Sequence, residues 1–159
     1  MVAIRLEYQG DLHCKAVHEL SGTVLTTDAP KDNQGRGESF CPTDLVATAL
    51  GSCILTVMGI MARSLNIDIT GTTATVGKEM ATVPVRMIHK LIVKVHVPHR
   101  VSDQNKRRLE THTCLVHQSM HFEWLTCRHC PDGAAESRNH PILALFGNSR
   151  SARSRSQLI

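Results

Sequence analysis

A long uncharged segment constrains the fold of this chain more than any other feature of its sequence. Residues 45–62 contain no acidic or basic side chain. Their apolar residues recur at steps of three and four, the period of one face of an α-helix. Pro42 suits the first helical position, and Asp44 places a carboxylate in the first turn, where the helix dipole favours negative charge. We therefore predict a helix over residues 42–65, with Cys53 on its buried apolar stripe.

A membrane span is the competing interpretation of this segment, because 18 uncharged residues approach the minimum length for crossing a bilayer. Polar and small residues, such as Thr48, Gly51 and Ser52, dilute its hydrophobicity. The whole chain is 42% hydrophobic and 20% charged, as in ordinary soluble proteins. The first residues also lack the apolar core of a secretory signal. We expect a soluble, cytoplasmic protein with no membrane partner.

The size and composition of the chain predict one domain with an aliphatic core. A length of 159 residues suits a single domain that folds without disulfide bonds. Aromatic residues make up only 3%, which disfavours stacking on nucleic-acid bases. The formal charge is +4, and the basic residues are scattered until Arg150, Arg153 and Arg155. Scattered charges are typical of a solvated surface, so we expect no nucleic-acid partner.

Strand-like and helical segments follow one another in partly separate groups. Alternation of Ile4, Leu6 and Tyr8 with charged residues predicts a half-buried strand. Turn-forming residues over 28–41 predict a loop, and Ser102 suits the N-cap of a second helix. Further strands are predicted at residues 14–18, 23–27, 70–76 and 87–97. This order predicts the α+β fold class.

The last part of the chain, from Phe122 onwards, has a different composition. Periodic apolar residues become rare, and the chain ends in a run rich in serine and arginine. We predict a folded domain over residues 1–121 and a divergent, poorly ordered tail over residues 122–159. Only residues 142–146 are apolar enough for a short ordered piece. A changed reading frame near the end of the gene is one hypothesis for this tail, which an uninterrupted native frame would exclude.

Six cysteines are present in a chain that we expect to be cytosolic, where thiols stay reduced unless a function oxidises them. Taken alone, Cys53 and Cys114 are typical of core-filling residues. Cys127 and Cys130 have a spacing found in zinc sites and redox pairs, but no second such pair completes a four-ligand site. We therefore expect no metal and no cofactor.

Two motifs around cysteines resemble those of a known family. Residues 39–53, SFCPTDLVATALGSC, resemble the helix-opening motif of the OsmC-like family, which includes the organic hydroperoxide reductases. Residues 114–121, CLVHQSMH, resemble its second cysteine motif, normally Cys-Pro-Val-His with a Ser-Leu-His continuation. The loop over residues 27–38 is similar to the family segment that precedes the helix. The two cysteine motifs occur in the family's order, and the resemblance covers residues 1–121.

This resemblance implies a fold, an assembly and a reaction. Family members are α+β subunits with antiparallel sheets around a long central helix, and they form intertwined homodimers. The resemblance implies that Cys53 attacks an organic hydroperoxide and becomes a sulfenic acid, which Cys114 then resolves as a disulfide. A dithiol reductant, of lipoyl type or another thiol, restores both cysteines. The apolar helix around Cys53 favours an alkyl hydroperoxide over hydrogen peroxide.

The sequence departs from the family pattern at residues that would support the reactive thiolate. Thr43 stands where the reductases carry glutamate, and the acid follows one residue later as Asp44. Asp44 either holds a partner arginine or only favours the helix N-terminus. The N-terminal strands offer no clear arginine after Arg5, so Arg36 is the candidate cation, with a solvated surface role as the alternative. Leu115 also replaces the usual proline after the second cysteine.

These departures leave a second class of function open. The retained cysteines favour a thiol-dependent peroxidase that acts in oxidative-stress defence. The shifted acid and the missing strand arginine favour a non-enzymatic dimer that binds a small lipophilic or thiol ligand. The unusual tail favours a damaged copy of a family member. The candidate catalytic residues of the enzyme are Cys53, Cys114, Asp44 and Arg36.

Overall fold

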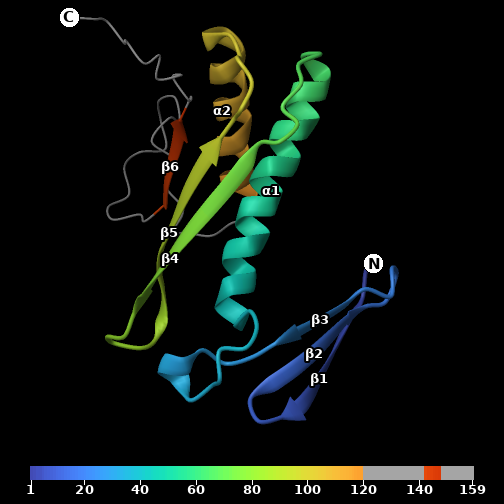
Figure 1. Cartoon of the computed structure of the whole chain (residues 1–159), viewed down its shortest axis with the longest axis vertical. Coiled ribbons are helices and arrows are strands. Elements are labelled where there is room, and N and C mark those ends of the chain that lie inside the picture. The colour runs from blue at the N-terminus through green and yellow to red at the C-terminus, as the bar shows by residue number, and fades with distance from the viewer. Residues whose placement is uncertain (120–141, 148–159) are drawn as a thin grey trace, which may run out of the picture. The chain divides into compact units, whose positions relative to one another are not determined.

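The fold is α+β, as predicted, and Figure 1 shows its two sheets and two long helices. The computed structural model describes residues 1–119 and 142–147, with side chains described as far as residue 111. The chain divides into two compact units, Met1–Ala49 and Leu50–Ile159, with the boundary inside the first long helix.

The first unit is built on an antiparallel meander of three strands. These are β1 (Ile4–Gly10), β2 (His13–His18) and β3 (Val24–Thr27), in the sheet order β1-β2-β3. The turn between β1 and β2 contains Gly10, Asp11 and Leu12, all with positive φ, after a register shift at the end of β1. The predicted meander is therefore confirmed. A short 3₁₀ helix, η1 (Lys31–Asn33), interrupts the loop that follows β3.

The apolar face of β1 is not half-buried as the alternation predicted. Ile4, Leu6 and Tyr8 are 60%, 70% and 64% exposed in the single chain. Within the described residues strand β1 pairs with β2 alone, and the three-stranded sheet by itself does not cover the face that carries these side chains. Alternation therefore identified a strand with one apolar face, and the subunit leaves that face open.

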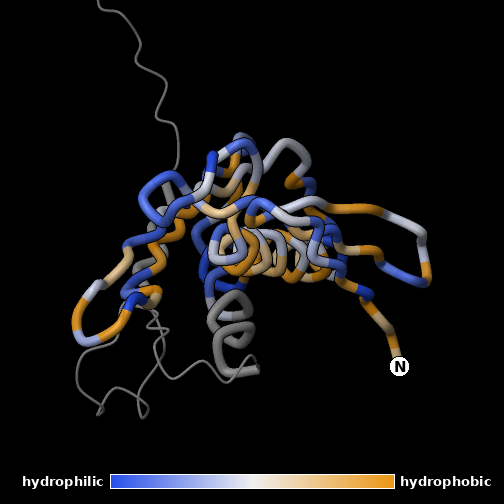
Figure 2. Tube along the Cα trace, turned by 90° about the horizontal axis from the view of Figure 1, so that it is seen from below, coloured by the Kyte–Doolittle hydropathy of each residue, from blue (hydrophilic) through white to orange (hydrophobic). Residues whose placement is uncertain are grey.

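Helix α1 (Pro42–Ser64) agrees with the predicted helix to within one residue. It ends because Asn66 adopts a left-handed conformation with φ of 53°. The Ile67 amide then donates to the Ala62 carbonyl at 3.0 Å, and the Asn66 amide donates to the Arg63 carbonyl at 3.2 Å. This pair of bonds is a Schellman motif, which satisfies carbonyls in the last turn. Figure 2 shows hydrophobic residues recurring around the coil of α1.

The second unit adds a sheet of three strands and helix α2. The strands are β4 (Thr73–Ala81), β5 (Met87–His96) and β6 (Ile142–Gly147), and α2 spans Asp103–Ser119. The β4–β5 pair is antiparallel, as predicted, whereas β5 and β6 pair in parallel. The parallel pairing is a difference from the expected antiparallel sheets. The long connection that contains α2 permits this pairing, because parallel neighbours need a crossover rather than a tight turn.

The core of the second unit lies between one face of the sheet and the buried side of α1. The fully buried side chains include Met58 of α1 with Leu91 and Val93 of β5. Gly51 permits the close approach, because a methyl group at this position would lie 2.9 Å from the Val76 Cγ2 atom of β4. By length and composition alone α1 could also cross a membrane, but the core helix of a soluble protein passes the same test.

Candidate functional site

The thiol of Cys53 is free and lies on α1 at intermediate exposure. We predicted it on the buried stripe of this helix, and that placement is wrong. The buried stripe consists of Ala47, Leu50, Gly51, Ile54, Met58 and Ala62. Cys53 belongs to a second apolar stripe of Val46, Ala49, Cys53, Val57 and Ile60, whose members are half-buried or exposed. At 3.6 residues per turn the two stripes are separated by roughly a third of a turn.

The exposure of this second stripe has a chemical consequence for Cys53. A half-buried thiol can be reached by a small molecule, and its neighbours along the second stripe, Ala49 and Val57, are apolar. A fully buried thiol would behave as a small core residue without reactivity. The structure therefore gives Cys53 the access that a reactive thiol needs.

Cys114 lies in α2, and both Cys53 and Cys114 belong to the second compact unit. The structure describes the backbone of this part of α2 but not its side chains. The predicted Cys53–Cys114 pair therefore stays a prediction. Within the predicted tail the structure describes only β6. This strand contains residues 142–146, which the sequence predicts as a short ordered piece. Cys127 and Cys130 lie outside the described residues.

Asp44 is engaged at the start of α1. Its Oδ2 atom accepts a hydrogen bond of 2.9 Å from the backbone amide of Cys41, which precedes the helix. The Cys41 carbonyl in turn accepts from the amides of Asp44 and Leu45, at 2.9 and 3.2 Å. An acid at the third helical position that reaches back to the N-cap amide is one half of a capping box. The geometry therefore supports the helix N-terminus as a role for Asp44.

Cys41 is the N-cap itself and is only 3% exposed. Its Sγ atom lies 3.0 Å from the hydroxyl of Thr43. Its burial and its position at the helix start show that Cys41 contributes to the structure of the helix N-terminus.

Arg36 is paired with an acid of the first unit. Its Nη2 atom donates to Asp11 Oδ2 at 3.1 Å, and both side chains are largely exposed, at 59% and 79%. Arg36 belongs to the unit Met1–Ala49, whereas Cys53 belongs to Leu50–Ile159. The pair with Asp11 matches the alternative that we weighed for Arg36, a solvated surface cation.

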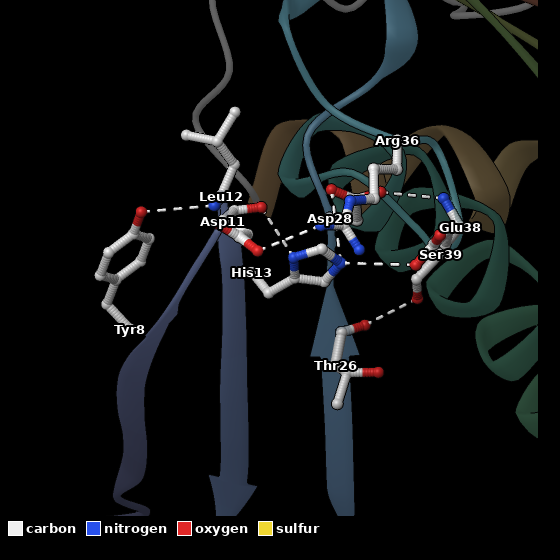
Figure 3. Close-up of polar contacts among 9 residues, drawn as sticks. All are labelled: Tyr8, Asp11, Leu12, His13, Thr26, Asp28, Arg36, Glu38 and Ser39. Atoms are coloured by element: carbon white, nitrogen blue, oxygen red, sulfur yellow. Dashed lines mark hydrogen bonds and ion pairs between the residues drawn. The ribbon is translucent and has the colours of Figure 1, made fainter.

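A polar cluster around Asp28 was missed by sequence reasoning, which treated Asp28 only as a turn former. Figure 3 shows the ring of His13, a residue of β2, close to Asp28 and Glu38. Both acids belong to the loop that follows β3. Asp28 is 0% exposed, and its Oδ2 atom accepts from the Glu38 amide at 2.9 Å. This amide bond is the largest cause that lowers the pKa of Asp28, and the charge of His13 contributes as well, while burial acts in the opposite direction.

A cavity of about 630 Å³ lies at the C-terminal end of α1. It is lined by the last turns of α1 and the segment before β4, including Leu55, Gly59 and Arg63. Cys53 does not line this cavity. Over the part of the chain that the structure describes, no three His, Cys, Asp or Glu side chains are grouped so as to hold a metal ion.

Comparison with known proteins identifies the family. The OsmC-like protein family matches residues 35–124, which include all of α1 and all of α2. A crystal structure from Psychrobacter arcticus, named for osmotic stress induction and a detoxification response, is 35% identical. The match covers 92% of this chain and 96% of that chain, with a TM-score of 0.73. A search of curated proteins gave no match.

More distant structures share the fold alone. An OsmC-like protein from Mycoplasma pneumoniae is 16% identical over 94% of this chain and 98% of that chain, with a TM-score of 0.67. An organic hydroperoxide resistance protein from Elizabethkingia anophelis is 11% identical over 94% and 96%, with a TM-score of 0.63. The family match over more than half of the sequence and the 35% identical relative together show that this chain belongs to the OsmC-like protein family.

Proposed function

We propose that this protein is a thiol-dependent peroxidase that reduces organic hydroperoxides and acts in oxidative-stress defence. The observation that carries the proposal is the free, half-exposed thiol of Cys53 on an apolar face of α1. Membership of the OsmC-like family supports it, because structural neighbours in that family are named organic hydroperoxide resistance proteins. OsmC-like proteins are soluble, and a cytoplasmic location is part of the proposal.

The proposed reaction has three steps. The Cys53 thiolate attacks one peroxide oxygen, so that an S–O bond forms, the O–O bond breaks and the alcohol leaves after it takes up a proton. The Cys114 thiol then attacks the sulfenic sulfur, so that an S–S bond forms and water leaves. A dithiol of the lipoyl type reduces this disulfide by exchange and is itself oxidised to a cyclic disulfide.

The second apolar stripe of α1 supports an organic substrate. The residues one turn before and after Cys53 on this stripe, Ala49 and Val57, are small and aliphatic. An alkyl or aryl hydroperoxide would bury hydrocarbon against them, at roughly 25 cal/mol for each Å² removed from water. Hydrogen peroxide has no such surface, and we therefore propose that it is the poorer substrate.

A homodimer is part of the same proposal. The apolar face of β1 and the second stripe of α1 are both more exposed than is usual for apolar faces of a subunit. Exposed apolar faces of this kind are typical of surfaces that another chain covers. An intertwined dimer, the assembly expected from the family, would cover the face of β1 and part of the stripe, while Cys53 stays open to a small molecule.

One observation favours the second candidate function, a non-enzymatic dimer that binds a small lipophilic or thiol ligand. Arg36 is held by Asp11 and would have to leave this pair to stabilise a Cys53 thiolate. Asp44 similarly bonds the Cys41 amide. We keep Arg36 and Asp44 as proposed supporting residues, and the test below decides between the two functions.

The test is the intact mass of the protein before and after one equivalent of cumene hydroperoxide, followed by peptide mapping. The peroxidase proposal predicts the loss of two hydrogens and a cross-link between the Cys53 and Cys114 peptides. The variant Cys114→Ser should instead trap Cys53 as a sulfenic acid that gains one oxygen. Cys14→Ser, a change at another half-buried free thiol, is the matched control and should still form the cross-link. Thiols that stay inert to hydroperoxide would support the binding function instead.

A further inference from the structure

Asp28 joins the two ends of the loop that precedes α1, through one backbone bond and one side-chain bond. Its backbone amide donates to the Phe40 carbonyl at 3.1 Å, and its Oδ2 atom accepts from the Glu38 amide at 2.9 Å. The loop between them is closed by further backbone bonds from Gly35 to Pro30 and from Gly37 to Ala29. The Asp28 carboxylate therefore holds the loop at Glu38, next to the backbone bond that joins Asp28 to Phe40.

One oxygen of this carboxylate has no hydrogen-bond partner. Asp28 is 0% exposed, and its Oδ1 atom accepts no bond from the protein. A buried carboxylate oxygen without a partner is costly unless a positive charge lies nearby. The nearest candidate is the imidazole of His13, whose Nε2 atom lies 3.6 Å from Asp28 Oδ1.

The second nitrogen of His13 fixes where its protons lie. Its Nδ1 atom is 2.8 Å from the Asp11 carbonyl oxygen, which can only accept, so Nδ1 carries a hydrogen. In the neutral ring Nε2 then has a lone pair. This lone pair would face Asp28 Oδ1 and, at 3.8 Å, Glu38 Oε2. Two carboxylates around a lone pair repel it, whereas they attract the N–H of an imidazolium.

The other charged groups at this cluster do not supply the missing charge. Arg36 is paired with Asp11 at 3.1 Å. Glu38 is itself negative, and its side chain is 62% exposed. Within the described residues no group of three side chains is placed to hold a metal ion. The proton on His13 is thus the positive charge that the geometry offers to Asp28.

We propose that residues 28–40 form a proton-dependent latch in front of α1, which is closed when His13 is an imidazolium and loosens when His13 loses that proton. The latch is independent of the peroxidase proposal, because none of its contacts involves Cys53 or Cys114. Histidine is the side chain that changes charge most readily near neutral pH, which suits it to a proton-dependent contact.

The experiment is an NMR titration of the full-length protein between about pH 5 and 8 that follows the His13 ring and the Glu38 amide. We expect the two signals to titrate together. The protection factor of the Glu38 amide, corrected for intrinsic exchange at each pH, should fall by about tenfold as His13 is deprotonated, a coupling typical of opposite charges within about 4–6 Å. The amide of His18, which donates to Thr23 within the meander, should not change.

Three variants separate this latch from a merely structural contact. In His13→Gln the pH-dependent fall in the protection factor of the Glu38 amide, here called the step, should disappear. In His13→Lys the Glu38 amide should stay protected to a pH well above 8, since lysine keeps its charge to about pH 10. His18→Gln on the same strand, where the ring bonds Ser21 at 2.6 Å, should leave the step unchanged. A step that survives in His13→Gln would overturn the proposal. So would a step that needs added Zn²⁺ and vanishes in EDTA, because a metal would then be the counter-charge.

Discussion

Cys53 lies at the centre of a helix face that is apolar but only partly buried. Ile54, the next residue, lies on the other stripe and is 5% exposed. Neighbouring residues of a helix are about 100° apart around its axis. A thiol at position 53 is therefore accessible, whereas a thiol at position 54 would be buried. The reactivity that we propose for Cys53 therefore depends on α1 keeping its rotation against the sheet, and Gly51 permits the close contact with Val76.

The first prediction concerns Gly51 and Gly59, two glycines of α1. Gly59→Ala should raise stability by about 0.4–1 kcal/mol, because alanine restricts the unfolded chain and nothing lies within 4 Å of the new methyl group. Gly51→Ala should be less stable than Gly59→Ala by about 1–3 kcal/mol, because its methyl group would lie 2.9 Å from Val76 Cγ2. Denaturant unfolding of both variants measures the difference.

A double-variant cycle checks the cause of that difference. In a Val76→Ala background the penalty at Gly51 should shrink, because the clashing methyl groups of Val76 are absent. An equal penalty in both backgrounds would mean that the contact with Val76 does not limit the position.

The second prediction concerns Asp44. In Asp44→Asn the side chain can still accept from the Cys41 amide but no longer carries charge at the helix N-terminus. Stability should fall by about 0.3–1 kcal/mol, because a negative charge that favours the helix N-terminus is lost. A loss of turnover without a loss of stability would instead assign Asp44 to positioning a group at the reactive thiol.

Part of this site could be predicted from the sequence, and the rest could not for physical reasons. The motif around Cys53 identified the thiol and its helix. Periodicity could not tell which of two apolar stripes on α1 is buried, because both have the same spacing. The cluster of His13 and Asp28 joins residues far apart in sequence, and no local pattern predicts such a pair.

At the scale of elements, local signals placed the helices well and the strand ends less well. Strand β4 was predicted at residues 70–76 but spans Thr73–Ala81. It starts late because the Thr70 amide bonds the Asp68 side chain at 2.8 Å and the Thr72 amide bonds the Ile69 carbonyl. Because of these bonds, residues 70–72 form a turn. The β-branched side chains of Thr70 and Thr72, taken alone, would favour a strand. The start of α2 was confirmed, with Ser102 accepting from the Asn105 amide at 3.3 Å.

The third prediction belongs to β6, which covers the edge of β5 within the predicted tail. A chain that ends at residue 141 should have a lower thermal midpoint than one that ends at residue 147. We expect a shift of at least about 2–4 °C, which corresponds to about 1 kcal/mol in a chain of this size, and aggregation through the open edge. Equal midpoints in differential scanning calorimetry would mean that β6 contributes no stability.

At the scale of the whole molecule, the open apolar face of β1 is the main feature that the single chain does not explain. A three-stranded sheet with an exposed apolar edge strand would favour association with another chain. The proposed homodimer would bury this face, and it accounts for an alternating pattern that the subunit leaves exposed.

The fourth prediction tests that surface with two neighbouring residues of β1. Leu6→Lys should weaken dimerisation by at least about tenfold, because burial of a leucine contributes about 1.5–3 kcal/mol. Glu7→Lys, on the opposite face of the same strand, is the matched control and should have little effect. Sedimentation equilibrium gives both dissociation constants. Equal constants for the two variants would place the dimer contact elsewhere.

The most direct test of the central claim is the rate of cumene hydroperoxide consumption with dihydrolipoamide as reductant. The wild-type protein, Cys53→Ser, Cys114→Ser and the control Cys14→Ser are compared at equal folded concentration. The account predicts turnover by the wild type and Cys14→Ser, no turnover by Cys53→Ser, and at most one equivalent consumed by Cys114→Ser. A wild-type protein as inactive as Cys53→Ser would contradict the peroxidase function and leave the binding function in its place.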